Sequence, residues 1–418
     1  MKRFLKPYLV CLTIIVMIVN YGCKKSDSPI SDMSLNKVKV YDDTLADIRN
    51  HSINIEAGSD QLYMTYGVGR GLYFDYLNGL LYAGGFDDFN ARLMATDFEG
   101  NLKWIKELPA NRMADDILVL DNGDVVVGTF TFGNFSSELN LIRFDKNGEK
   151  IVEVTAPISS GVTGVENICL TRAFNGNIIV CGAYSGLPTA AGYVCEYDLN
   201  FNQIWYKGFY NPIDRVLATE DNNYLFIQES YNDSSIIVLK TNATGDSLWS
   251  KPISDNFLQI SSAGFYPGCN DFVKNSNGNY VVSVSSRVSY DFQAEIKSYL
   301  YEINANGDLL NTTSSGFLNF NYNAALVPKK DGGLFALMQS YLYDYTSLNT
   351  PPQVFNDIHS GYASFDAGLS LVSNRQIQSI TSDHLTAACN LPTGEIACFG
   401  LVKSEGKIYY KPELIIVK

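Results

Sequence analysis

The chain has 418 residues, of which 46% are hydrophobic and 13% aromatic, and its formal net charge is -13. Such an acidic chain repels nucleic acid, so we expect no nucleic-acid partner. The cysteines show no Cys-x-x-Cys spacing and the three histidines lie far apart, so the sequence gives no support to a zinc site. We expect neither a metal nor a cofactor.

Residues 1–22 predict a signal peptide, because a basic start is followed by the apolar stretch Tyr8–Val19. About 12 apolar residues are too few to span a bilayer as a helix. Gly22 directly before Cys23 resembles a bacterial lipobox, although Asn20 stands where Leu is usual. We therefore expect Cys23 to be lipidated and residues 23–35 to form a linker; ordinary cleavage, with Cys23 incidental, is the alternative. The predicted location is the bacterial cell envelope, as an outer-membrane lipoprotein anchored through its lipid.

A turn phrase containing Asn-Gly or a relative, followed by an apolar run, recurs seven times. Its mean spacing is about 52 residues, which is within reach of a four-stranded propeller blade. Asn and Gly supply the backbone conformations that tight turns need. The seven copies lie at Asn78–Gly84, Asn122–Gly128, Asn175–Gly182, Asn222–Asn223, Asn277–Gly278, Asp331–Gly332 and Thr393–Gly394.

A second phrase, Asp/Asn-x-x-Gly followed by a strand, alternates with the first. All three tryptophans of the chain occupy one position in it: Trp104, Trp205 and Trp249. Each repeat then supplies four strands, which we name a to d in chain order. This pattern predicts an all-β fold over residues 36–418, a single seven-bladed β-propeller of four-stranded antiparallel blades.

The last repeat ends at the C-terminus with a c strand, Leu414–Lys418, and has no d strand after it. An N-terminal strand is therefore expected to complete the last blade. The candidates are residues 37–41 and residues 51–56. Such closure leaves no open sheet edge.

The stretch Ala95–Trp104 resembles the repeat of the quinoprotein-dehydrogenase-like (PQQ-repeat-like) propellers, and residues from about 36 resemble uncharacterised lipoproteins of Bacteroidota. The resemblance implies a fold only, because one fold hosts many functions. It also implies that the three tryptophans are packing residues that dock neighbouring blades. Only three of the seven repeats keep the tryptophan, so the chain is a divergent relative.

Known catalytic motifs are missing. The cysteine pair of the alcohol-oxidising quinoproteins is absent, and the spacing of the Asp, Gly and Trp residues differs from that of sialidase boxes. The sequence also lacks Gly-x-Ser-x-Gly, His-Glu-x-x-His and a phosphate loop. We therefore expect no catalytic residue.

One set of polar residues stands just before the apolar run of each a strand. Because a strands line the centre of a propeller, these side chains would form a rim around one mouth and could bind a ligand or ion. The alternative is that they satisfy backbone donors or line a water-filled channel. The candidate rim consists of Arg70, Asp116, Asn167, Asp214, Asp271, Asn323 and His384.

The longest insertion lies between the b and c strands of the sixth repeat, residues 340–361. Aromatic residues beside carboxylates suit sugar or peptide binding; a lid packed on its own blade is the alternative. The candidate binding residues are Tyr341, Tyr343, Tyr345, Phe355 and His359.

These observations favour a non-catalytic ligand-binding or protein-scaffolding module, expected to be a monomer, with a glycan or an envelope protein as partner. The alternative is a carbohydrate-active enzyme, a glycan hydrolase or lyase, that uses carboxylates at the propeller mouth. A shallow channel favours binding, whereas two facing carboxyls about 5 to 10 Å apart favour hydrolysis.

Cys389 and Cys398 flank the Thr393–Gly394 turn symmetrically, and a two-residue turn would place them opposite each other. A cross-strand disulfide is then feasible; two reduced cysteines are the alternative. Cys169 and Cys181 flank another such turn but miss that symmetry by one residue.

Overall fold

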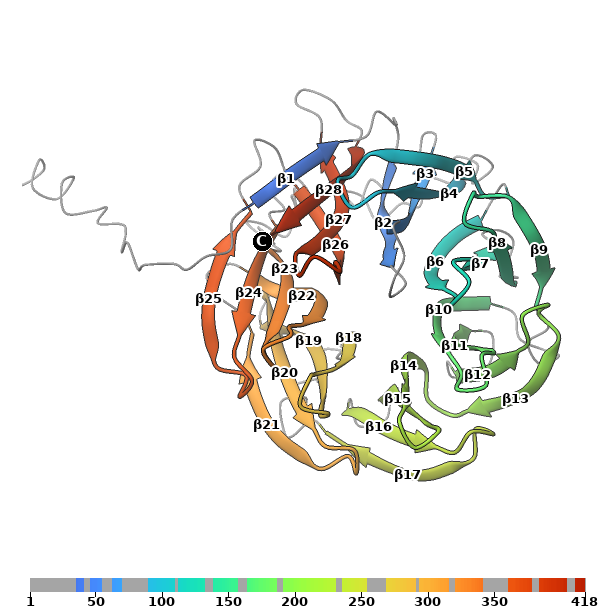
Figure 1. Cartoon of the computed structure of the whole chain (residues 1–418). Helices are drawn as coiled ribbons and strands as arrows, with labels where there is room; N and C mark the ends of the chain where they lie inside the picture. Colours follow the sequence, from blue (N-terminus) through green and yellow to red (C-terminus); the bar gives the residue numbers. More distant parts are fainter. Residues whose placement is uncertain are drawn as a thin grey trace, which may run out of the picture. The chain divides into compact units, whose positions relative to one another are not determined.

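Figure 1 shows a computed structural model of the chain, which divides into two units, residues 1–33 and 34–418. Every residue that the structure describes belongs to the second unit, and the elements formed by those residues are β-strands. The described residues are 35–40, 46–54, 62–69, 89–109, 112–131, 138–156, 164–185, 191–230, 235–253, 268–290, 293–315, 320–340, 360–377, 383–403 and 410–417.

The fold is an all-β propeller built from four-stranded antiparallel blades, as predicted. Within a blade each strand pairs with the next along the chain, and the first strand is innermost (Figure 1). Four blades are separate sheets. They are β10 (Gly164–Arg172), β11 (Ile178–Ser185), β12 (Ala191–Tyr197) and β13 (Gln203–Phe209); β14 (Ile213–Thr219), β15 (Asn223–Ser230), β16 (Ser235–Thr241) and β17 (Ser247–Pro252); β18 (Gly268–Lys274), β19 (Tyr280–Tyr290), β20 (Gln293–Ile303) and β21 (Leu309–Ser314); β22 (Phe320–Pro328), β23 (Leu334–Ser340), β24 (Ser360–Phe365) and β25 (Leu371–Gln376).

The other strands form one twelve-stranded ladder that contains two further blades. In one of these blades, β1 (Leu35–Val40) pairs antiparallel with β28 (Tyr410–Val417) over its whole length, so the first candidate, residues 37–41, lies beside the C-terminal strand. The strand that contains residues 51–54 meets β28 only at the Ala46–Tyr410 pair. The two blades are β6 (Arg112–Val119), β7 (Val125–Thr131), β8 (Leu139–Phe144) and β9 (Lys150–Thr155), and β26 (Asp383–Asn390), β27 (Ile396–Lys403) and β28 (Tyr410–Val417) with β1 (Leu35–Val40).

The structure thus distinguishes six blades rather than the seven predicted. The strands β2 (Ala46–Asn54), β3 (Leu62–Gly69), β4 (Phe89–Thr96) and β5 (Leu102–Glu107) pair with one another but run on into β28 and β6 through one residue pair each. The sequence places a turn at Asn78–Gly84, and that segment lies outside the described residues. Strand β4 pairs instead with β3, so the spacing of the first repeat was misread.

The turns between the first and second strands explain the register of the blades. In the last one, Leu391 N–H donates to Glu395 O at 2.8 Å, and Gly394 has a φ of 88°. This is a three-residue loop whose left-handed glycine forms a bulge, not the two-residue loop assumed from the sequence. The extra residue moves the register, so that Cys389 pairs with Ala397 and Cys398 pairs with Ala388. The two cysteines therefore do not face each other, and the predicted pairing is wrong.

The tryptophans lie between blades at equivalent places, as the sequence predicts. A Cβ atom built on the left-handed glycine of the next blade's outer turn would come within 2.9 Å of the indole at Gly148 (Trp104), 2.9 Å at Gly245 (Trp205) and 2.5 Å at Gly307 (Trp249). Only glycine leaves room for this contact, and its positive φ costs little there. The structural role implied for the tryptophans is confirmed.

Two residues after each tryptophan, a lysine reinforces the same contact. Lys106 reaches Glu149 at 2.8 Å, and Lys251 reaches Asp308 at 2.6 Å, in each case on the neighbouring blade's outer turn. We call each tryptophan with its lysine and the facing turn an outer clasp. The ion pairs are exposed and contribute little, so the indole–glycine packing supplies most of the stabilisation.

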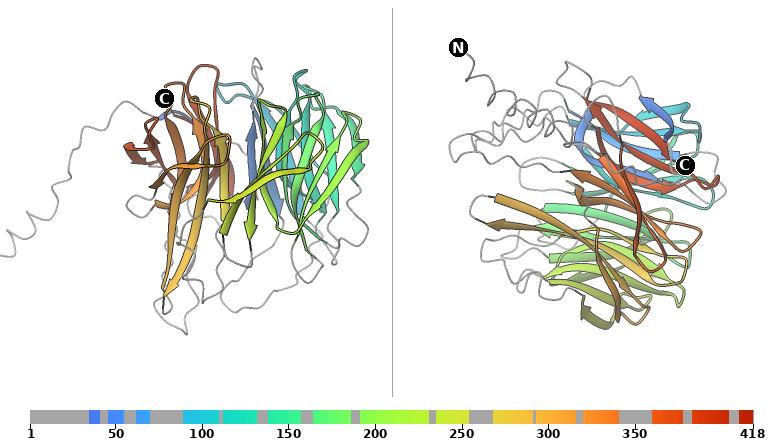
Figure 2. Two further views of the ribbon diagram at one scale, coloured as in Figure 1. Left: turned by 90° about the horizontal axis from the view of Figure 1, so that it is seen from below. Right: turned by 90° about the vertical axis from the view of Figure 1, so that its left-hand side faces the viewer.

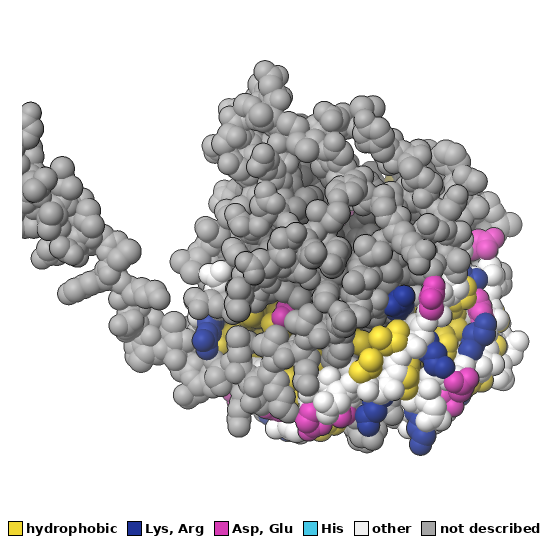
Figure 3. Space-filling view, turned by 90° about the horizontal axis from the view of Figure 1, so that it is seen from above, with side chains coloured by type: hydrophobic (Ala, Val, Ile, Leu, Met, Phe, Trp, Pro, Cys, Tyr) yellow, Lys and Arg dark blue, Asp and Glu magenta, His cyan; other side chains and the backbone are white. Residues whose placement is uncertain are grey.

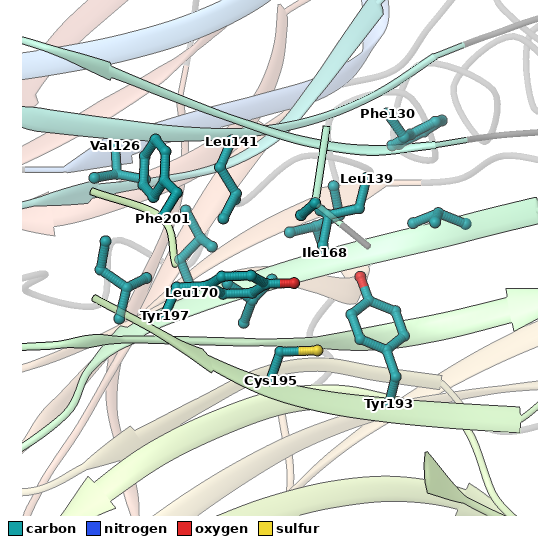
Figure 4. Close-up of a cluster of buried hydrophobic side chains, with 14 of the residues drawn as sticks. Val126, Phe130, Leu139, Leu141, Ile168, Leu170, Tyr193, Cys195, Tyr197 and Phe201 are labelled. Atoms are coloured by element: carbon teal, nitrogen blue, oxygen red, sulfur yellow. The ribbon is translucent and has the colours of Figure 1, made fainter. Parts of the chain in front are cut away.

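The core lies between neighbouring blades. Figure 4 shows the cluster shared by β6–β9 and β10–β13, in which Val126, Leu141 and Tyr193 are fully buried. Both faces of the middle strands are covered, so these strands read as continuous apolar runs such as Val125–Val127. Viewed from the side, the strands of each blade stand next to one another (Figure 2).

Candidate functional site

The innermost strands carry an irregularity at equivalent places. Strands β6, β14, β18, β22 and β26 each shift register by one residue at the equivalent place, and β22 has a second shift nearer its start. The bulge of β10 also lies nearer the start of its strand. Bulges re-aim side chains and are common beside functional sites. The turn between the first and second strands of each of these blades contains one left-handed residue. The residue seven positions before it is the equivalent position on each innermost strand, and we call these six residues the inner ring. Its members are Asp116, Cys169, Arg215, Asp271, Ala325 and Ala387.

Two inner-ring carboxylates bind the backbone of the next blade in the same way. Asp116 Oδ2 accepts from Leu170 N–H at 2.8 Å, and Asp271 Oδ2 accepts from Leu326 N–H at 2.6 Å. Their other oxygens accept from the following residue of their own strand, both at 2.8 Å. Asp115, one residue earlier, accepts from Ile168 N–H at 2.5 Å. These carboxylates are held in fixed orientations by charge-assisted hydrogen bonds.

Arg215 is the cation of the inner ring. Its Nη1 donates to Asp214 O at 2.9 Å and its Nη2 donates to Asn270 O at 2.7 Å, which joins β14 to β18. Burial lowers the pKa of Arg215, but neighbouring groups, Cys169 and Cys269 first and then Asp271 and Asp116, raise it above its usual value. Burial also raises the pKa of the Cys269 thiol, so that thiol is neutral near pH 7 and the carboxylates are the effective partners.

Burial governs the titration of the surrounding acids. It raises the pKa of Asp115 and of Asp116 to about 6 in each case, against the opposing effects of their backbone hydrogen bonds and of Arg215. The pKa of Asp271 is raised for the same reason. Two of the three carboxyls around this guanidinium, Asp115 and Asp116, therefore titrate close to neutral pH, which is common at functional sites.

A second carboxyl pair lies on β14 and β15. Asp214 is 9% exposed and hydrogen-bonds to the Glu229 side chain, and its Oδ2 atom is buried without a hydrogen-bond partner. Burial and then the Asp214 charge raise the pKa of Glu229 to about 9, whereas burial raises that of Asp214 to about 6. Two acids in contact cannot both ionise, so the pair shares a proton at pH 7.

The structure divides the predicted rim. Asp116 and Asp271 lie in the inner ring, and Asp214 comes one residue before it. Asn167 comes two residues earlier, where its side chain accepts from Ala183 N–H and donates to Ile213 O. Arg70 lies outside the described residues, and for Asn323 and His384 only the backbone is described.

The predicted binding residues Tyr341, Tyr343, Tyr345, Phe355 and His359 also lie outside the described residues, as does Cys23. The insertion that contains the aromatic residues does separate β23 from β24, as expected.

Sequence reasoning missed Arg215, Asp115 and Glu229. The adjacent charged pairs Asp115–Asp116 and Asp214–Arg215 at the start of an apolar strand were the available signal, since alternation alone allows only one of the two to face inward.

Within the described ranges, no group of three or more His, Cys, Asp or Glu side chains is placed to bind a metal ion. The same part of the chain contains no helix long and apolar enough to cross a membrane. On the face seen in Figure 3, the described side chains mix basic, acidic and apolar groups.

No protein-family model matches the chain, and no curated protein matches its sequence. Among solved structures, the fold is similar to that of the polysaccharide lyase Uly1, with 10% identity over 89% of this chain and 91% of that one and a TM-score of 0.53. A Bacteroides caccae protein of unknown function matches at 12% identity over 73% and 96%, with a TM-score of 0.42. The Penicillium chrysogenum α-L-arabinanase matches at 11% identity over 72% and 91%, with a TM-score of 0.46. At these identities the similarity shows the propeller fold alone.

Proposed function

We propose that this protein is a lipid-anchored propeller of the cell envelope that binds a polar, hydroxyl-rich ligand at the inner ring without transforming it. The observation that carries the proposal is the fixed orientation of the inner-ring charges: the carboxylates of Asp116 and Asp271 each accept two backbone N–H groups, and Arg215 is held by two carbonyls. Preorganised acceptors and donors bind hydroxyl groups without paying for side-chain ordering.

The same hydrogen bonds argue against catalysis. A general acid or base must exchange its proton with a substrate, but both oxygens of Asp116 and both of Asp271 already accept from backbone donors. Glycan hydrolysis by two carboxyls needs about 5 to 10 Å between them. Asp214 and Glu229 are in hydrogen-bond contact, so this pair is too close.

The second candidate is a glycan-active enzyme, with Glu229 as acid and Asp214 as base. Glu229 is protonated and Asp214 is largely ionised at pH 7, which matches such roles. The name of the polysaccharide lyase with a similar fold agrees with this candidate, but the shared fold does not carry its activity over.

A glycan array probed with the chain lacking residues 1–23 tests both candidates. We expect retention of one class of glycan and no release of shorter products from it after prolonged incubation. Product release that disappears in Glu229→Gln would establish the enzyme instead, and retention of no glycan would overturn glycan binding.

The anchor forms part of the proposal. Replacing Cys23 with Ser in the whole chain should abolish acylation and release the protein from the membrane fraction. A variant that still carries lipid would contradict the lipobox interpretation.

We also propose that the full ring holds seven blades, with β1 completing the last one. An experimental structure would show the number of blades.

A further inference from the structure

Cys169 and Cys181 stand directly opposite each other on β10 and β11, although the sequence suggested otherwise. Their pairing continues without a register shift from the turn, where Ala173 N–H donates to Asn177 O at 2.9 Å. Counting outward from that hydrogen-bonded pair, Cys169 and Cys181 form another hydrogen-bonded pair. Such pairs have Cα atoms about 5.5 Å apart, within the range that disulfides span.

The two side chains share one face of the sheet and touch. Their thiols hydrogen-bond to each other, and both cysteines are reduced in this structure. Cys169 is 7% exposed, whereas Cys181 is completely buried. Cys169 is also the inner-ring member beside Arg215. Because Cys169 is the less buried of the two thiols, it is the partner that a disulfide donor reaches first.

We propose that Cys169 and Cys181 form a thiol–disulfide site, a cross-strand pair that is oxidised by a disulfide donor while the β10–β11 hairpin assembles. The Cys169 thiolate attacks one sulfur of the donor, and the donor's other sulfur leaves as a thiolate. The Cys181 thiol loses its proton and displaces the donor from the mixed disulfide. One S–S bond forms between the cysteines, two protons are released, and the donor is reduced to two thiolates.

The protein contains a matched control for this geometry. Cys389 and Cys398 flank the equivalent turn of β26 and β27, but each is paired with an alanine and they are one residue out of register. Successive residues of a strand point to opposite faces, so these two thiols lie on opposite sides of their sheet. Both pairs are mostly buried, and they differ chiefly in register.

The test is refolding of the whole chain in oxidised and reduced glutathione, followed by alkylation under denaturing conditions and peptide mapping without reductant. We expect most molecules to carry a 169–181 linked peptide, lighter by about 2 Da than the two thiol peptides. Cys389 and Cys398 should be fully alkylated, and Cys181→Ser should leave Cys169 free.

Full alkylation of both Cys169 and Cys181 in the refolded protein would overturn the proposal. Equal linkage at 389–398 would also overturn it, because oxidation would then not depend on register. The readout is chemical, so it is independent of whether the inner ring binds a ligand.

Discussion

The outer and inner strands of the same blades use their repeat positions differently. On the outer strands, Trp104, Trp205 and Trp249 each pack on a left-handed glycine of the next blade, and a lysine follows two residues later. On the inner ring, the equivalent positions hold two acids, a cysteine, an arginine and two alanines. Repetition at three junctions marks a packing contact that these junctions share, whereas variation at an equivalent position marks residues that act at one blade alone.

The largest expected effect comes from removing the cation of the inner ring. Arg215→Met should destabilise the protein by about 3 kcal/mol at pH 7, because Asp116 and Asp271 lose their opposite charge and two carbonyls lose their donors. Urea unfolding at pH 7 measures this. A loss below about 1 kcal/mol would mean that the inner ring is well solvated and that its charges are independent.

The outer clasp should be the next most sensitive place. Gly307→Ala should cost about 2 to 3 kcal/mol, because a Cβ there would lie 2.5 Å from the Trp249 ring and the φ of 75° disfavours alanine. Gly278→Ala is the matched control, since its φ is 90° but nothing lies within 4 Å of the added atom. It should cost only about 1 kcal/mol in the same unfolding assay. Equal losses would show that indole packing contributes nothing.

The shared proton of Asp214 and Glu229 makes stability depend on pH in a defined direction. The pKa of folded Glu229 is about 9, above its value of 4.5 in the unfolded chain, so its contribution is complete below pH 4.5 and is lost as the pH rises through 9. Glu229→Gln removes that titration. Between pH 6 and pH 9 the parent should therefore lose stability relative to the variant. Parallel pH profiles for the two proteins would rule out the shared proton.

The exposed ion pair of an outer clasp should matter least. The Glu149 side chain is 75% exposed and lies 2.8 Å from Lys106. Glu149→Gln removes the charge from this pair and should change the free energy of unfolding by less than about 0.5 kcal/mol. Thermal unfolding in low and in high salt checks this value. A loss as large as that of Gly307→Ala would assign the clasp to charge rather than to packing.

The sequence predicted the fold class and the tryptophan contacts because both arise from repeated turn and strand chemistry. It misjudged the first repeat, where the phrase Asn78–Gly84 looks like every other copy, and spacing cannot tell which strand β4 will pair with. It also placed Cys389 opposite Cys398 and set Cys169 one residue away from Cys181, because a bulged glycine turn and a two-residue turn have the same residues but differ by one in register. Cys389 and Cys398 are reduced, which was the alternative to a disulfide.

The candidate site was only half predictable for the same reason. Asp116 and Asp271 were found from their place before an apolar run, but Arg215, which directly follows the candidate Asp214, was missed. The bulge in β14 gives Asp214 and Arg215 different partners: Asp214 contacts Glu229, and Arg215 donates to backbone carbonyls. A bulge has no characteristic residue type here, so the sequence does not reveal it.

Binding isotherms on inner-ring variants test the central claim most directly. The glycan retained on the array should bind the chain lacking residues 1–23 and should lose at least about tenfold in affinity, or 1.4 kcal/mol, in Asp116→Asn and in Asp271→Asn. Asp198→Asn, which changes an exposed outer turn on β12–β13, should bind as the parent does. Unchanged affinity in both inner-ring variants, with their folding intact, would contradict the assignment of the binding site to the inner ring.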